Sequence, residues 1–223
     1  MSLKHKIQNI VNFPKSLYVN LKLFPIKTAL KFPVWVRYDT KLGKLEKNKI
    51  QFETACIKPK MLRIGVEGQA GAYGNQKTYF SIDKNAQLVI KDKIQIAEKS
   101  TFIVDGKMKI GSNFYANTGC FIVCCYDIEI GDDVLLGWNV NIRDIDGHSI
   151  ISGDGERKES KKKIYIGNHV WLCAHTHILK GVSIPDDCVV GYGSIVTRKF
   201  EHSNTVIAGY PAKVLQENVN WIK

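Results

Sequence analysis

The sequence predicts an all-β fold in which the chain winds into stacked, three-sided coils of short parallel strands. Aliphatic residues recur at intervals of six, a period that fits neither a helix nor plain strand alternation. These positions are Ile130, Leu136, Ile142, Ile166, Leu172, Ile178, Ile184, Val190 and Val196. The residue four places after them is small or β-branched, at Val134, Val140, Val170, Thr176, Val182, Cys188 and Ser194. One large and one small inward residue on each side is what a narrow prism can hold.

Residues 1–60 differ from the repeat body, residues 61–223, in charge. They hold 13 Lys and Arg against 3 acids, whereas the rest of the chain holds 19 against 18. Apolar residues on one face predict a short amphipathic helix over residues 3–12, and residues 34–52 have a strand-like pattern. We therefore expect a basic N-terminal segment of mixed helix and strand, followed by the coils.

The repeat is interrupted once and ends before the C-terminus. Residues 146–163 are too polar for a prism face and predict a projecting loop. Residues 209–223 leave the repeat through a glycine and a proline, and we expect them to end in a short helical cap. His148 opens the loop, where an imidazole can move protons near neutral pH, although a loop histidine without a task is the more common case when position alone is considered. Asp144 and Asp146 either orient this imidazole or form an ordinary turn, which we favour.

The composition also bears on location and cysteine chemistry. No apolar run has the roughly 20 residues needed to cross a bilayer, and the opening MSLKHKIQNI lacks the apolar core of a secretion signal. The six cysteines show no CxxC pair. We therefore predict a cytoplasmic chain with reduced thiols.

Three motifs occur in order between residues 110 and 215: FYANTGC, then IGDDVLLGWNVNIRDIDGH, then IGNHVWLCAHTHILKGVSIPDDCVVGYGSIVT followed by VIAGYPAKV. This region resembles the hexapeptide-repeat O-acetyltransferases, which include galactoside, maltose and polysaccharide acetyltransferases. The resemblance implies a left-handed parallel β-helix and a homotrimer with active sites between subunits. It also implies acetyl-CoA as co-substrate and no metal.

When the functional residues of the family are matched to this sequence by position, the resemblance implies that His148 is the general base. It implies that Asn117 contacts the acceptor or the oxyanion. The coenzyme groove would be lined by Trp171, Ala174, Tyr192, Thr197, Arg198 and Lys213. Two positions depart from the family pattern. Cys124 stands where the sugar acetyltransferases have an acidic acceptor contact, and Cys173 replaces a glycine. The first departure argues against a galactoside-like or maltose-like acceptor.

The expected activity is transfer of an acetyl group from acetyl-CoA to a hydroxyl of a sugar or surface-polysaccharide acceptor. A non-catalytic β-helix scaffold or binding protein is an alternative. A γ-type carbonic anhydrase-like zinc protein is another, because His169, His175 and His177 lie on neighbouring coils. The γ-type carbonic anhydrase pattern has a histidine at the position where this chain has Lys180, which argues against a zinc site.

The basic segment also suggests partners. Aromatic residues among the lysines of residues 1–36 fit peripheral contact with an anionic membrane, and they fit equally an arm that packs in the trimer. No known module for reading nucleic acid accompanies the charge, so we expect no nucleic-acid partner.

Overall fold

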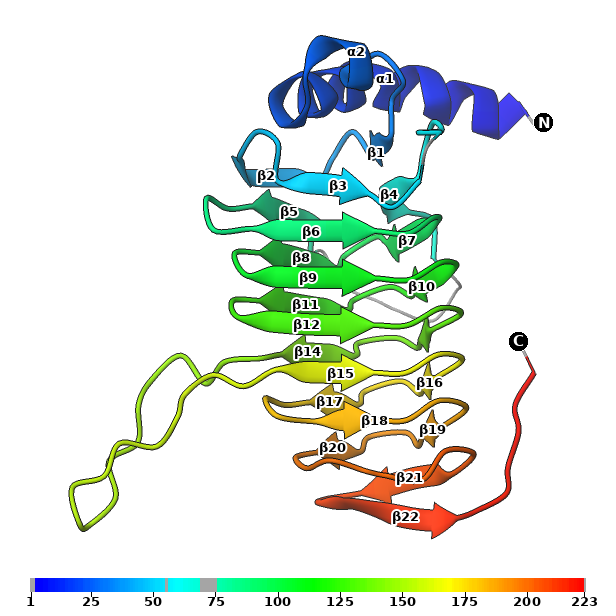
Figure 1. The fold of residues 1–223 in the computed structure, drawn as a ribbon. Coiled ribbons are helices and arrows are strands. Elements are labelled where there is room, and N and C mark those ends of the chain that lie inside the picture. The colour runs from blue at the N-terminus through cyan, green and yellow to red at the C-terminus, as the bar shows by residue number, and fades with distance from the viewer. Residues whose placement is uncertain (1–2, 55, 69–75, 223) are drawn as a thin grey trace.

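The computed structural model describes residues 3–54, 56–68 and 76–222, which form a prism of three parallel sheets (Figure 1). Sheet A contains β1 (Val34–Val36), β4 (Leu62–Val66), β7 (Ile94–Ala97), β10 (Phe114–Ala116), β13 (Leu135–Leu136), β16 (Trp171–Leu172), β19 (Val189–Val190), β21 (Val206–Gly209) and β22 (Ala212–Gln216). Sheet B contains β2 (Lys41–Leu45), β5 (Tyr79–Ile82), β8 (Thr101–Val104), β11 (Phe121–Cys124), β14 (Asn141–Arg143), β17 (His177–Ile178) and β20 (Ile195–Val196). Sheet C contains β3 (Ile50–Phe52), β6 (Gln87–Ile90), β9 (Lys107–Ile110), β12 (Asp127–Ile130), β15 (Ile164–Ile166) and β18 (Ser183–Ile184).

The coils wind left-handed. In Figure 1 the strands of sheet C run from left to right across the front while the chain descends from its N-terminal end. The nine aliphatic residues of the six-residue repeat are at most 1% exposed, and so are the seven small residues that follow them. In the upper coils Phe80 and Phe102 stack inside the prism with ring centroids 6.1 Å apart. The predicted left-handed parallel β-helix is therefore confirmed, with its core on the axis.

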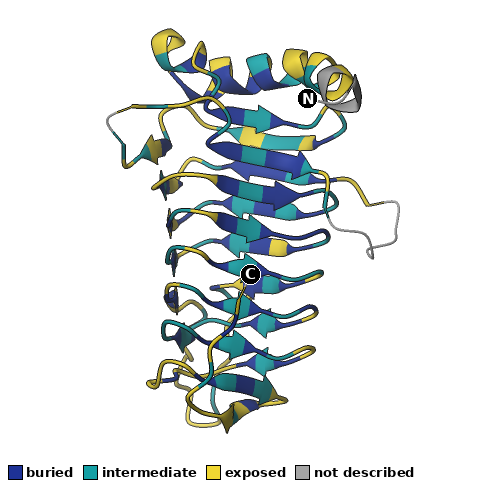
Figure 2. Ribbon diagram, turned by 90° about the vertical axis from the view of Figure 1, so that its right-hand side faces the viewer, coloured by how far each residue is buried: buried dark blue, intermediate teal, exposed yellow. Residues whose placement is uncertain are grey.

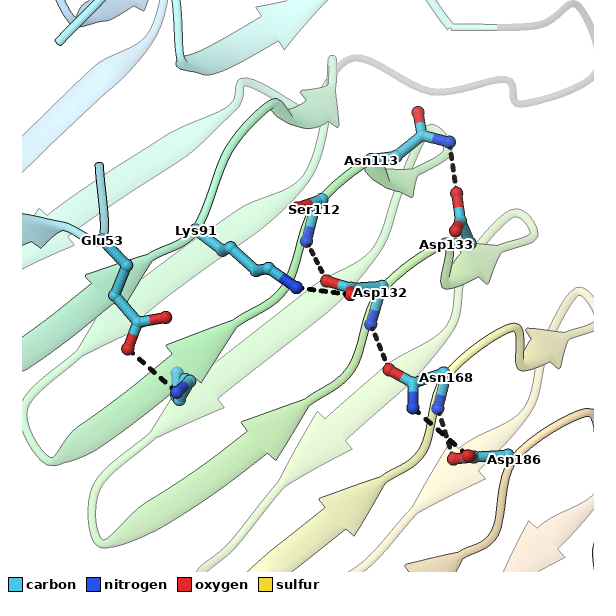
Figure 3. Close-up of polar contacts among 9 residues, drawn as sticks. Glu53, Lys91, Ser112, Asn113, Asp132, Asp133, Asn168 and Asp186 are labelled. Carbon is cyan, nitrogen blue, oxygen red and sulfur yellow. Dashed lines mark hydrogen bonds and ion pairs between the residues drawn. The ribbon is translucent and has the colours of Figure 1, made fainter. Parts of the chain in front are cut away.

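The corners between sheets C and A are held by short polar side chains. Four successive corners place one residue in the left-handed region: Asn113, Asp133, His169 and Asp187 (φ 51–59°). Asparagine and aspartate tolerate this conformation better than other non-glycine residues. Beside them a ladder links one coil to the next (Figure 3): the Ser112 N–H donates to Asp132, the Asp132 N–H to Asn168, and the Asn168 N–H to Asp186, at 2.6, 2.9 and 2.7 Å. The Lys91 ammonium lies 2.6 Å from the Asp132 carboxylate. Its hydrogen bond is the largest of the causes that hold the pKa of Asp132 below its ordinary value.

Two helices, α1 (Leu3–Leu23) and α2 (Ile26–Ala29), close the N-terminal end of the stack. The short helix expected over residues 3–12 is in fact 21 residues long and continues through Pro14. The reason is tertiary: Ser16 Oγ accepts the N–H of Val36 at 3.0 Å, and Asn20 bonds both backbone groups of Val34. The second half of the helix therefore docks on β1, the last strand of sheet A at this end.

Residues 34–52 form the first complete coil. The strands β1, β2 and β3 pair in parallel with β4, β5 and β6. The coil stack therefore begins at Val34, inside the segment of residues 1–60 that we had separated from the repeat body.

The predicted helical cap over residues 209–223 is wrong for the residues that the structure describes, which run to residue 222. The strands β21 and β22 form an antiparallel hairpin, and an extended tail follows. Gly209 (φ 110°) and Pro211 make the turn. The residues after the turn form backbone hydrogen bonds with β21, which they would not form in a helix.

Candidate functional site

His148 lies on an arm, residues 146–163, which leaves the prism between sheets B and C (Figure 1). The two legs of the arm pair with each other, and the N–H of Asp146 donates to the carbonyl of Ser160 at 2.8 Å. Lys180 joins both legs, because its ammonium lies 2.6 Å from the Asp146 carboxylate and also donates to the Glu159 carbonyl. The base of the arm is therefore fixed to the prism, two residues before the exposed His148.

Asp144 is buried at the corner from which the arm leaves. Its two carboxylate oxygens accept the backbone N–H groups of Cys125, Tyr126 and Asp127 at 2.7–2.9 Å. Both carboxylate oxygens are therefore hydrogen-bonded to the backbone at the corner of the preceding coil. Asp144 thus supports the backbone of the preceding coil at the corner from which the arm leaves.

Asn117 lies at the corner between sheets A and B, directly after β10, and is 4% exposed. Its Oδ1 accepts the N–H of Thr118 at 2.9 Å. The backbone after β4 lies directly on this corner, since a Cβ added to Gly68 would be 1.9 Å from Thr118 Oγ1 and 3.1 Å from Asn117 Oδ1. Only glycine permits so close an approach.

A cavity of about 760 Å³ opens beside this corner, between α1 and the outer face of sheet A. Its sheet side includes a row of side chains from neighbouring strands: Trp35, Arg63, Gln95 and Tyr115. Arg63 donates to Gln95 Oε1 at 2.8 Å, and burial lowers the pKa of its guanidinium. The row ends at Tyr115, two residues before Asn117. The cavity therefore offers aromatic and hydrogen-bonding groups next to the predicted acceptor contact.

Trp171 projects from the outer face of sheet A on β16 and meets Trp221 of the C-terminal tail, with ring centroids 5.8 Å apart. Trp221 is 7% exposed, stacks on His169 at 4.3 Å, and donates its Nε1–H to the His169 carbonyl at 2.8 Å. The tail runs back along the stack over sheet A (Figure 2). Trp221 was not among the residues predicted from the sequence. The available signal was a single tryptophan in a polar tail.

The remaining residues expected in the coenzyme groove fall into separate groups. Ala174 and Tyr192 lie at the corner between sheets A and B, where the Tyr192 ring is 73% exposed. Thr197 and Arg198 follow β20 and lie at the corner between sheets B and C, on the same side as His148. Lys213 is on the terminal strand β22. One chain therefore places Asn117, Trp171, Ala174 and Tyr192 on one side of sheet B, and His148, Thr197 and Arg198 on the other.

The three neighbouring histidines have other partners. His169 is 2.8 Å from the Asp187 carboxylate, the ring of His175 is 5.2 Å from that of Tyr192, and His177 lies on sheet B. His169 and His175 both have positive φ, as corner residues. Within the described ranges, no three His, Cys, Asp or Glu side chains gather as metal ligands.

Burial makes three cysteines poor nucleophiles. It raises the pKa of Cys120 to about 12 and that of Cys173 to about 11, and it also raises the pKa of Cys124. The thiolate is the reactive form, so these thiols are inert at neutral pH. Cys124 is fully buried in β11 and faces the core, so its side chain does not reach an acceptor outside the prism.

No protein-family model matches the chain. Among curated proteins, it is 40% identical to the galactoside O-acetyltransferase of Escherichia coli (strain K12) over 119 residues, which cover 52% of this chain and 57% of that protein. A galactoside acetyltransferase solved in complex with coenzyme A is 39% identical, with a TM-score of 0.44 over 50% of this chain and 55% of the other. The chain spans about half the length of the curated relatives that it matches.

A longer match concerns the fold. The polysialic acid O-acetyltransferase OatWY aligns with 85% of this chain and 87% of its own, at 24% identity and a TM-score of 0.50. This likeness shows the shared coil alone. The chain is therefore similar over about half of its length to a galactoside O-acetyltransferase, and it shares the coil fold of OatWY.

Proposed function

We propose that this protein transfers an acetyl group from acetyl-CoA to a hydroxyl of a sugar or glycan acceptor. The observation that carries the proposal is the 40% identity to a galactoside O-acetyltransferase over 119 residues. The exposed His148 on an anchored arm supports it, because a general base must reach a bound hydroxyl. The cavity that ends at Tyr115 supports a carbohydrate acceptor, since its aromatic and polar side chains lie on the strands that lead to Asn117, two residues after Tyr115.

In the proposed reaction, a ring nitrogen of His148 accepts the hydroxyl proton while the acceptor oxygen bonds to the thioester carbonyl carbon. Asn117 or backbone N–H groups donate to the oxyanion that forms. The intermediate collapses with cleavage of the carbon–sulfur bond, and the imidazolium returns the proton to the coenzyme A thiolate. Direct transfer of this kind needs no cysteine nucleophile, which agrees with the raised pKa values of the buried thiols.

We further propose a homotrimer in which each active site is shared between two copies. Sheet B separates the side of the prism that carries Asn117 and Trp171 from the side that carries His148. The arm of residues 146–163, on which His148 lies, projects outward from its own prism (Figure 1). A cleft between two copies would bring the two groups together, with the base from one copy and the acceptor contact from the next.

Mixed trimers test the shared site. Trimers of His148→Ala alone and of Asn117→Ala alone should each be inactive. Random co-assembly of the two variants should restore about a quarter of the wild-type activity, because one site in about four then combines two intact halves. The measurement is thiol release from acetyl-CoA after refolding the mixture. Inactive mixed trimers would show that both residues act within one copy.

Coenzyme binding separates an acetyltransferase from a non-catalytic scaffold. Acetyl-CoA at about 100 times its Kd should stabilise the folded chain by about 2.7 kcal/mol and raise its melting temperature. Arg198→Ala and Lys213→Ala should reduce this rise, because cations suit the coenzyme phosphates. The matched control is Lys199→Ala, an exposed neighbouring cation. An unchanged melting temperature in the wild type would favour the scaffold.

A further inference from the structure

The helix α1 meets the prism with polar side chains. Ser16 and Asn20 are fully buried and bond the backbone of β1, with Asn20 Nδ2 donating to the Val34 carbonyl at 2.6 Å. Lys15 is also turned inward, where its ammonium donates to the Thr40 carbonyl at 2.7 Å. The inward face of α1 therefore combines these hydrogen bonds with the apolar side chains of Val19 and Leu23, which are fully buried in the core.

The outward face of the same helix is apolar. Ile10, Pro14, Tyr18 and Leu21 follow one another at intervals of three and four, which places them along one stripe. Ile10, Tyr18 and Leu21 are 73, 52 and 44% exposed. Figure 2 shows α1 lying across the end of the stack with exposed residues along its outer surface. The inward face already has its own buried apolar residues, Val19 and Leu23, so this second, exposed stripe on the opposite face indicates an apolar partner outside the chain.

The apolar surface continues onto the next helix and is bordered by positive charge. Ile26 and Leu30 are 65 and 61% exposed. Lys22, Lys27 and Lys31 are exposed around them, and the first acidic residue of the sequence is Asp39. An identical surface from a second copy would bring like charges together, whereas an anionic surface would complement them.

We propose that the α1–α2 end of the stack binds the surface of an anionic lipid bilayer. Ile10, Tyr18 and Leu21 enter the boundary between head groups and acyl chains, while Lys22, Lys27 and Lys31 contact the anionic head groups. Neither helix of the described chain has the length and apolar character of a membrane-spanning segment, so α1 lies along the surface. The stack then stands away from the bilayer.

Flotation of the full chain with lipid vesicles tests this proposal. The wild type should float with vesicles of phosphatidylglycerol and phosphatidylcholine, and it should remain at the bottom with phosphatidylcholine alone. The double variant Ile10→Ser/Leu21→Ser should bind roughly tenfold or more weakly, since both side chains lose apolar burial. Lys27→Gln/Lys31→Gln should also bind more weakly and respond less to added salt.

The matched control is Ile150→Ser/Ile151→Ser, which removes two apolar side chains, 57 and 68% exposed, from the arm instead. It should float like the wild type, and all variants should keep the wild-type melting temperature, because the replaced side chains lie on the surface. Absence of flotation, equal binding to neutral vesicles, or wild-type binding by Ile10→Ser/Leu21→Ser would overturn the proposal. Larger assemblies of the wild type than of Ile10→Ser/Leu21→Ser would also overturn the proposal, because a second copy of the chain would then cover the stripe.

Discussion

Replacing His148 with alanine should lower the turnover number by about 10²–10⁴-fold, the usual contribution of a general base. The Kd for acetyl-CoA should stay nearly unchanged, because His148 acts on the acceptor hydroxyl in the proposed reaction. Its side chain is exposed on the arm, so the melting temperature should not move either. Turnover is followed by thiol release, and the Kd by calorimetry.

The control for this variant is His202→Ala, which removes an exposed imidazole from another part of the chain. It should retain wild-type turnover. Turnover of His148→Ala within a few fold of the wild type would end the proposed role. A large rise in its Kd for acetyl-CoA would instead place the imidazole in the coenzyme groove.

Asp144→Ala should destabilise the fold by roughly 3 kcal/mol, since three backbone donors lose their carboxylate and each costs about 1 kcal/mol. In a chain of this length that loss lowers the melting temperature by roughly 6–12 °C. Asp144→Asn retains one acceptor oxygen and should lose less. Thermal unfolding followed by circular dichroism measures both variants.

Asp146→Ala serves as the comparison, because it removes a carboxylate two residues away whose partner is the Lys180 ammonium near the surface. Such exposed pairs contribute up to about 1 kcal/mol. A normal melting temperature for Asp144→Ala together with a large loss of turnover would contradict the supporting role. That result would assign Asp144 to orienting His148.

The prism could be predicted because its cause is local. Each side of a coil repeats one large and one small inward residue, as in Leu172 and Thr176, and the six-residue spacing predicts three short sides in each coil. The helix beyond Pro14 could not be predicted in this way. Its stability depends on Ser16 and Asn20 meeting β1, a contact between segments that only the folded chain brings together.

The same distinction applies to the two ends of the chain and to the site. The strand β22 forms because β21 offers it a partner, and no residue of the tail signals that pairing. The polar interruption that carries His148 was visible in the sequence. The contact between Trp171 and Trp221 was not, because the tail must first fold back over sheet A. A site shared between copies is likewise a property of an assembly.

The hydrogen bonds of Ser16 and Asn20 also close one edge of the stack. A finished coil offers unpaired strand edges on which another strand can pair. At this end, the two side chains bond the backbone groups of Val34 and Val36 that a further strand of sheet A would need. A pair of short polar residues thereby disfavours end-to-end pairing of sheet A with another molecule.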